Sequence, residues 1–339
     1  MKQTKVLSSL MLLLTAFIWG LAFVAQSEGT EFIGPFTLNF TRFLLGGFVL
    51  IPVILLREFL SKKQSDKISR ENNTSSKLPV FHKNNIIGGI CCGAVLGIAS
   101  SFQQFGLMHT TVGKAGFITT LYVIFVPILG IFIHKKAGIR IWISAGIAII
   151  GLYLLCMQES LTLSKGDILI LVCAIIFSVH VMTVDYFSPK GDGVVISCIQ
   201  FFTCAFINGI GAFVLEQPRI ENILASYICI LYLGVLSCGV AYTLQVVAQK
   251  NTDPTVAALT MSLESVIAAA AGVVLLGQYM NAREVLGCVL VFGAVILAQI
   301  PLKALGRNAF TKQAFSKQAF AKPENILIKE ETANYNPES

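Results

Sequence analysis

Residues 254–276 read PTVAALTMSLESVIAAAAGVVLL, and Glu264 is the one charged side chain among them. A helix that crosses the hydrocarbon core of a bilayer needs about 20 consecutive, mostly apolar residues. The stretch is long enough, and it places a carboxyl group about halfway along. An ionisable group is costly to insert at that depth, so it is typical of a functional site. The stretch therefore predicts a transmembrane helix with a functional acid.

Nine further stretches share this length and apolar character. They are Val6–Gln26, Pro35–Leu56, Ile86–Leu107, Gly113–Ile133, Gly138–Met157, Asp167–Phe187, Val194–Leu215, Ala225–Ala248 and Ala282–Pro301. A membrane β-barrel is encoded instead by segments of about 10 residues with alternating hydrophobicity, and the sequence contains none. The sequence predicts an all-α integral membrane protein with ten transmembrane helices.

The composition of the 339 residues excludes a soluble enzyme. Hydrophobic residues make up 55% of the chain and charged residues 13%, against about 45–50% and about 25% in soluble domains. The net charge of +7 has no basic stripe interleaved with aromatic residues, so nucleic acid is not an expected partner. The nine cysteines lack the spacing of metal ligands and are interpreted as packing residues. No cofactor or metal is expected, and the expected partners are the bilayer and a small solute.

The distribution of Lys and Arg predicts the orientation. With the N-terminus inside, the cytoplasmic segments carry twenty of these residues and the opposite face carries four, Lys114, Lys165, Arg219 and Arg283. Both termini are therefore expected in the cytoplasm, in a multi-pass protein of the cell membrane. The first apolar run is longer than that of a signal peptide and is interpreted as a retained helix.

Two polar segments lie outside the predicted helices. Residues 57–85 are rich in Ser, Asn and Lys, and we expect a cytosolic loop there. Residues 304–339 contain a five-residue repeat, AFTKQ followed by AFSKQ. We interpret this segment as a low-complexity, basic cytosolic tail that touches anionic lipid.

The two halves of the chain match each other at two offsets. An offset of 142 places Gln103 on Gln245 for helices 3 to 5, and an offset of 158 places Arg42 on Gln200 for helices 1 and 2. Five helices per half is an odd number, so the second copy enters the membrane from the opposite side. We predict two inverted repeats, residues 1–157 with the cytosolic loop 57–85 and residues 158–303, with a substrate site between them near the midplane.

Several motifs resemble the EamA-type family of the drug/metabolite transporter superfamily. They are SFQQFGL (101–107), GKAGFITTLYV (113–123) with Pro127, AYTLQVVAQ (241–249), PTVAAL (254–259) and SLE (262–264). The resemblance covers residues 6–301. It implies ten helices in two units around a central cavity, and movement of amino acids, metabolites or toxic compounds, usually outward.

The chain departs from the family pattern at two places. Ser265 stands where the family often has a proline after the glutamate of helix 9, so a proline-induced break is not assured there. Gln278 stands where the family tends to have an acid, and Lys135–Lys136 occupy the matching place in the first half. The role of that acid in the family does not transfer to this chain.

The charged residues at mid-depth are the first candidates for solute handling. Glu264 can carry a proton or bind an amine, or it can be a neutral acid bonded to a neighbouring helix. Its repeat partner is Tyr122. Arg42 can bind a solute carboxylate through its forked donors, or pair with Glu264 as a clamp between helices, and we favour the clamp. His180, with an ordinary pKa of about 6.5, is a second candidate for proton coupling, although a packing role is favoured.

Polar and aromatic residues complete the predicted substrate site. Gln103 and Gln245 suit a neutral or zwitterionic solute, or they hold helices together. Trp19, Tyr122 and Tyr242 offer aromatic walls for an organic cation. Gly89, Gly93 and Gly97 recur every fourth residue, which predicts close approach of another helix. Pro127 predicts a kink in helix 4.

These features predict a secondary transporter that exports a small organic solute by alternating access, with proton coupling through Glu264 or His180. A solute uptake permease and a non-transporting sensor or assembly protein are the alternatives. The sequence lacks a Walker-type phosphate loop and the paired acids or histidine clusters of a membrane enzyme. Catalytic residues are therefore not expected, and a homodimer is left open.

Overall fold

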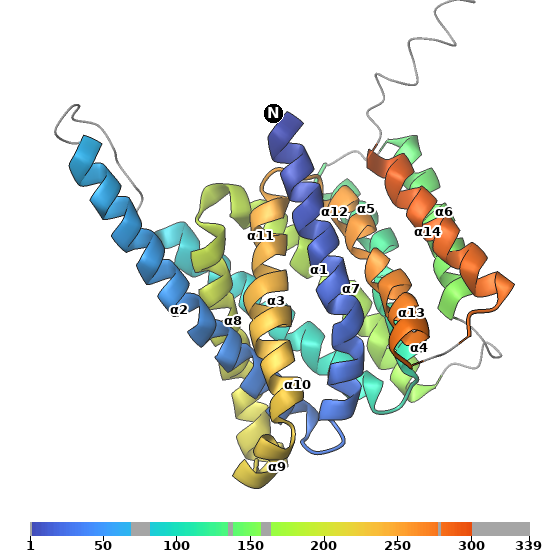
Figure 1. The fold of residues 1–339 in the computed structure, drawn as a ribbon, viewed down its shortest axis with the longest axis horizontal. Helices are drawn as coiled ribbons and strands as arrows, with labels where there is room; N and C mark the ends of the chain where they lie inside the picture. Colours follow the sequence, from blue (N-terminus) through green and yellow to red (C-terminus); the bar gives the residue numbers. More distant parts are fainter. Residues whose placement is uncertain (1, 69–81, 135–137, 157–163, 277–278, 300–339) are drawn as a thin grey trace, which may run out of the picture. The chain divides into compact units, whose positions relative to one another are not determined.

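The structure of the protein is a computed structural model that describes residues 2–68, 82–134, 138–156, 164–276 and 279–299. Every regular element among these residues is a helix (Figure 1). The helices of the first half are α1 (Lys2–Gly29), α2 (Pro35–Ile68), α3 (Lys83–Leu107), α4 (Val112–Thr120), α5 (Tyr122–Phe132) and α6 (Ile139–Cys156).

The second half begins with α7 (Lys165–Phe187), η1 (Ser188–Lys190), α8 (Gly193–Gly211) and η2 (Ala212–Glu216). It continues with α9 (Ile220–Ala225), α10 (Tyr227–Leu231), the π-helical segment η3 (Tyr232–Tyr242) and α11 (Thr243–Gln249). It ends with α12 (Pro254–Met261), α13 (Leu263–Leu276) and α14 (Ala282–Gln299).

Eight helical segments of the described chain are long and apolar enough to cross a membrane. They correspond to the predicted helices 1–4, 6–8 and 10. Shorter apolar helices occupy the predicted positions of helices 5 and 9, at Ile139–Leu155 and Pro254–Ala270. The structure thus places helices at all ten predicted positions, and the count of ten membrane spans stays a prediction.

Glycines bring α3 against α8, as the repeated spacing predicts. A side chain at Gly93 would have its Cβ only 2.5 Å from the carbonyl oxygen of Gln200, and one at Gly89 would meet Ile199 at a similar distance. The Sγ of Cys204 donates a hydrogen bond of 3.1 Å to the carbonyl of Gly93. Backbone therefore packs on backbone, which only residues without a Cβ allow.

Helices α2 and α8 are antiparallel and pack along much of their length. Glu216, just after α8, contacts the first turn of α2, whereas Arg57 of α2 contacts Asp192 at the start of α8. Between these ends, the rings of Phe43 and Phe201 stack with centroids 6.2 Å apart. These phenylalanines are a pair at the sequence offset of 158.

The predicted boundary of the first cytosolic loop is wrong at its start. Helix α2 continues from Arg57 to Ile68, because the segment REFLSKKQ contains mostly residues that favour helix. Helix α3 likewise begins at Lys83. The rest of the predicted loop and the tail at 304–339, with its five-residue repeat, lie outside the described residues.

Candidate functional site

Two of the predicted membrane helices are interrupted about halfway, and the interruptions face each other. Helix 4 is divided at Leu121 into α4 and α5, and helix 9 at Ser262 into α12 and α13. The hydroxyl of Tyr122 points to Oε1 of Glu264 at 3.5 Å, and the hydroxyls of Thr120 and Ser265 are 3.0 Å apart. Positions 122 and 264 are repeat partners at the offset of 142, so matching points of the two halves meet here.

Side-chain hydroxyls, rather than prolines, accompany both interruptions. The hydroxyl of Thr120 donates to the carbonyl of Gly116, and that of Ser262 donates to the carbonyl of Leu259 at 2.7 Å. Such bonds back to the preceding turn bend helices. The division comes at Leu121, six residues before Pro127, which lies inside α5, and the kink predicted at Pro127 stays a prediction. Ser265 in place of the family's proline does not prevent a break.

A small cavity opens beside this crossing point. Its lining residues are Trp19, Ala22, Phe23, Gln26, Arg42, Gln103, Thr119, Tyr122, Phe177, Ser237, Tyr242 and Glu264. Its volume of about 40 Å³ is enough for about three water molecules. The cavity in this conformation is thus too narrow for an organic solute, so binding one requires the surrounding helices to separate.

Six of the seven predicted substrate-binding residues line this one cavity: Trp19, Arg42, Gln103, Tyr122, Tyr242 and Glu264. The rings of Trp19 and Tyr242 lie 4.5 Å apart and form an aromatic wall. Gln103 donates to the hydroxyl of Thr119 at 3.4 Å. Gly20 brings α1 close enough that a Cβ there would lie 2.7 Å from the carbonyl of Glu264. The tertiary structure thus gathers residues from six segments of the chain.

Arg42 does not form the helix clamp that the sequence favoured. Its side chain is buried, and within the described residues it makes no ion pair with Glu264. Its Nε and Nη2 have no hydrogen-bond partner in the same part of the chain. The guanidinium lies 4.8 Å from the ring centre of Phe43. A buried cation whose donors are unused is costly unless an anion binds to it, so this wall of the cavity suits a carboxylate.

Six residues of the cavity wall were missed by sequence reasoning: Ala22, Phe23, Gln26, Thr119, Phe177 and Ser237. Phe177 is the repeat partner of Trp19 at the offset of 158, and that relation was available as a signal. Gln26 follows Trp19 by seven residues on the same helix face, and its Oε1 lacks a partner in the described structure. Ser237 lies in the π-helical segment η3, whose winding the sequence did not indicate. π-helical turns are frequent at functional sites.

Gln245 and His180 lie outside the cavity lining. Both are buried. The Nε2 of His180 lies 3.1 Å from Oε1 of Gln200, and the ring of His180 meets that of Tyr242 edge to face with centroids 6.2 Å apart. Phe177 also contacts the His180 ring, and both Tyr242 and Phe177 line the cavity, so these two aromatic side chains lie between His180 and the cavity. Gln245 follows Tyr242 by one turn of helix.

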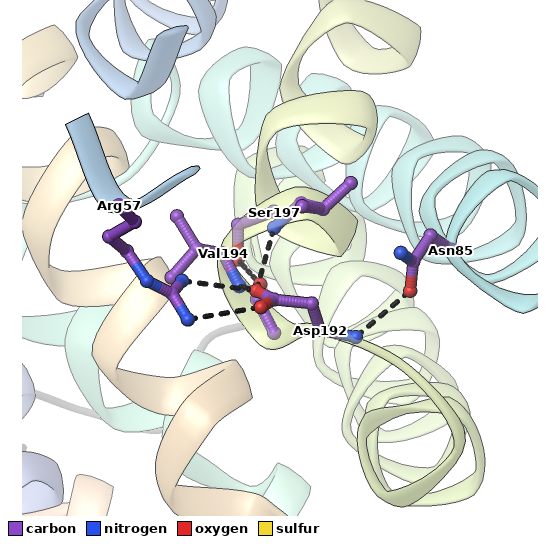
Figure 2. A network of polar contacts seen from close by, with 7 residues as sticks. Arg57, Asn85, Asp192, Val194 and Ser197 are labelled. Atoms are coloured by element: carbon purple, nitrogen blue, oxygen red, sulfur yellow. Dashed lines mark hydrogen bonds and ion pairs between the residues drawn. The ribbon is translucent and has the colours of Figure 1, made fainter. Parts of the chain in front are cut away.

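Polar contacts hold the two ends of the α2–α8 pair. Figure 2 shows one end, where the carboxylate of Asp192 accepts from Nη1 and Nη2 of Arg57 at 3.2 and 3.0 Å and from the backbone N–H of Val194 at 2.9 Å. The backbone N–H of Asp192 donates to Oδ1 of Asn85 on α3, also at 2.9 Å. Asp192 is thus both the N-cap of α8 and a link to α2.

The other end has a similar arrangement with the helices exchanged. The carboxylate of Glu216 accepts from the backbone N–H groups of Phe36 and Thr37 at 2.8 and 2.7 Å and from the hydroxyl of Thr37 at 2.8 Å. An acid from beyond the end of α8 therefore caps the first turn of α2, where the N-terminal N–H groups favour negative charge. Both ends join the same two helices through a capped N-terminus.

Comparison with known proteins agrees with this architecture. The EamA-like transporter family matches residues 6–157 and 164–299. A curated relative from Archaeoglobus fulgidus, named an uncharacterized transporter, is 26% identical over 294 residues, which are 85% of this chain and 84% of the relative. A crystal structure of another protein superposes with a TM-score of 0.70 at 17% identity, covering 88% of this chain and 98% of that one. This last likeness concerns the fold alone.

The apolar helices and these matches point to the class of integral membrane transporters. Within that class, the chain belongs to the EamA-like transporter family. The resemblance found in the motifs is thereby confirmed.

Proposed function

We propose that the protein is a secondary transporter that exports a small organic solute, such as an amino acid, metabolite or toxic compound, across the cell membrane. Ten helices in two inverted repeats rock about a shared site, with both termini in the cytoplasm. The observation that carries the proposal is the meeting of two interrupted helices at Tyr122 and Glu264 beside the cavity. Interrupted helices at the repeat interface are where transporters of this construction bind substrate.

Several features support the inverted arrangement. The repeat-related helices α2 and α8 are antiparallel, and the repeat-related phenylalanines 43 and 201 stack between them. Thr111 and Asp253, partners at the offset of 142, are both N-cap residues, of α4 and α12 respectively. Two backbone segments that begin at matching residues and divide within one residue of matching positions are expected of two copies of one unit.

Some cavity residues bind the charged groups of the solute, and others surround its apolar part. Arg42 binds an anionic group of the solute and Glu264 a cationic or hydrogen-bonding group. Gln103 donates from its amide, while Trp19, Tyr122 and Tyr242 flank the apolar part. Gln245 contacts the solute only in the conformation that opens to the opposite side of the membrane. Glu264, with a single bond of 3.5 Å from Tyr122, is also the first candidate for carrying a coupled proton, and His180 is the second.

The first test is metabolite profiling of a strain that lacks the gene beside one that overexpresses the protein. Export predicts that one compound class accumulates inside the deletion strain and is depleted inside the overexpressing strain. The opposite pattern identifies an uptake permease, and no reciprocal change identifies a sensor or assembly protein.

Proton coupling has a separate test in proteoliposomes. Net solute efflux should follow an imposed pH gradient in the wild type, and the Glu264→Gln variant should lose this dependence while it still exchanges solute. The His180→Gln variant reports on the second candidate. If net efflux ignores the gradient in all three proteins between about pH 5 and about pH 8, a range that spans the titration of histidine, the coupling proposal is rejected.

A further inference from the structure

We infer that a buried polar cluster on α7, α8 and α11, formed by His180, Gln200, Gln245 and Gln249, is a second solute-binding chamber, closed in this conformation. The inference rests on the proposed transport function and adds to it a site on the opposite side of the crossing point. We call these four residues the polar cluster. Its chemistry selects the polar, uncharged parts of the solute.

The repeat relation pairs three residues of the cavity lining with three residues of this cluster. At the offset of 158, Ala22 falls on His180 and Arg42 on Gln200, and at the offset of 142, Gln103 falls on Gln245. Both members of the pair Tyr122 and Glu264 lie at the crossing point itself. If the two halves exchange their conformations, three of the four residues of the polar cluster take the places of cavity-wall residues.

Unused hydrogen-bonding atoms mark the polar cluster independently of the repeat. Within the described residues, four of its atoms are buried without a hydrogen-bond partner: Nδ1 of His180, Nε2 of Gln200, Oε1 of Gln245 and Oε1 of Gln249. Each of the four side chains is almost completely buried. Buried polar atoms normally have partners, so four unsatisfied atoms in one place indicate groups that find partners in another state.

Hydrogen bonds join three of the four residues to neighbouring helices of the cluster. The amide of Gln249 donates to the carbonyl of Val181 on α7 at 3.1 Å, and His180 bonds Gln200 on α8 at 3.1 Å. Gln245 of α11 follows Tyr242, the last residue of η3, by three residues and precedes Gln249 by four, so the three side chains lie on one face of the continuous helix. Tyr242 and Phe177 both line the cavity and contact the ring of His180, so two aromatic side chains lie between the two chambers.

The ligand chemistry of the two chambers differs. The cavity contains the guanidinium of Arg42, whereas the corresponding position of the polar cluster is the neutral Gln200. Amide and imidazole groups donate and accept hydrogen bonds without a fixed charge. A solute that keeps its contact with Glu264 therefore exchanges a charged partner for neutral amides when it passes Tyr242.

Cysteine accessibility tests the inference in the full-length protein. Gln245→Cys and Ser237→Cys are each exposed, in right-side-out and inside-out membrane vesicles, to a membrane-impermeant cationic thiol reagent, and modified peptides are quantified by mass spectrometry. We expect Gln245→Cys to be modified at least tenfold faster from the membrane face of Lys250 than from the opposite face. Ser237→Cys, in the cavity, should show the reverse preference.

Native cysteines provide the control in the same samples. Cys198 lies two residues from Gln200 on α8, is buried, and points to the carbonyl of Gly47 on α2 at 3.6 Å. It should stay unmodified from both faces, which distinguishes opening of a chamber from unfolding of the helix bundle. Each variant is also checked for unchanged elution in size-exclusion chromatography.

The outcomes separate the inference from the proposed function. If a solute is transported but Gln245→Cys is modified from neither face, the inference is overturned and the transport function stands. If no solute moves and neither engineered cysteine reacts from either face, the proposed function fails. If Cys198 reacts as fast as Gln245→Cys, the labelling reflects loosened packing and the inference is overturned.

Discussion

The two sides of the crossing point have matching backbones and different side chains. On one side are the cavity with Arg42 and the end of the α2–α8 pair capped by Glu216. On the other are the polar cluster with Gln200 and the end held by Arg57 and Asp192. The cavity side has a buried, fixed charge, and the cluster side has its ionic contact at the exposed end. In the inverted repeat that we propose, the two copies provide similar backbone frames, and single substitutions between them make the two sides chemically unequal.

The largest expected effect comes from removing the charge difference between Arg42 on the cavity side and Gln200 on the cluster side. In Arg42→Gln, the cavity acquires the residue found on the cluster side, and the binding of a carboxylate-bearing solute should weaken by about 100-fold, since a buried charge pair contributes roughly 2–5 kcal/mol. Isothermal titration of the purified protein with the solute found by metabolite profiling measures the change. Arg42→Lys keeps the charge without the fork and should fall between the two. Equal affinity in Arg42→Gln and the wild type would show that the guanidinium does not contact the solute.

The next effect concerns the capped end on the cavity side. Glu216→Ala removes an acceptor of three hydrogen bonds from Phe36 and Thr37, and should lower the unfolding free energy by about 2 kcal/mol, the upper range for a lost N-cap. Thermal unfolding in detergent reports the change. Glu221→Ala, which lies in the nearby helix α9, is the matched control and should have little effect. A similar loss in both variants would mean that the cap is not the cause.

A smaller effect sharpens the difference between cavity and cluster. Gln245→Ala removes one hydrogen bond to the solute in the second chamber only, and should slow transport by about tenfold, equivalent to roughly 1.4 kcal/mol. Binding measured in the conformation with the cavity open should stay unchanged. Gln103→Ala is the repeat-related control, and this variant should bind the solute more weakly in the conformation with the cavity open. If Gln245→Ala weakens binding as much as Gln103→Ala does, the two chambers are not distinct.

The smallest effect is expected at the exposed end. Arg57→Ala breaks an ion pair whose side chains are 53% and 39% exposed, so the unfolding free energy should change by less than about 1 kcal/mol. Asp192→Ala should cost more, because it also removes the N-cap of α8. The same thermal unfolding assay compares both variants with Glu216→Ala. A loss from Arg57→Ala that equals that from Glu216→Ala would contradict the proposed contrast between the ends.

The sequence indicated much of the candidate site because charge is rare inside a membrane. Arg42 and Glu264 stood out for that reason alone, and the polar repeat pair Gln103 and Gln245 stood out next. The sequence did not indicate that Arg42 and Glu264 would line one cavity without pairing, because the distance between two side chains depends on how their helices pack. It also missed Ser237, since the π-helical winding of η3 is set by its neighbours.

The sequence by itself determines the apolar runs and the matching of the two halves. The runs can be recognised because each bilayer crossing requires about 20 consecutive, mostly apolar residues. The family follows from the same pattern and its motifs. Only the tertiary structure decided that the interrupted helices meet at Tyr122 and Glu264, and that Gln103 lies in a cavity while Gln245 is enclosed. Such differences between equivalent residues depend on which helices are in contact in one conformation. Those contacts are set by tertiary packing and cannot be predicted from the local sequence.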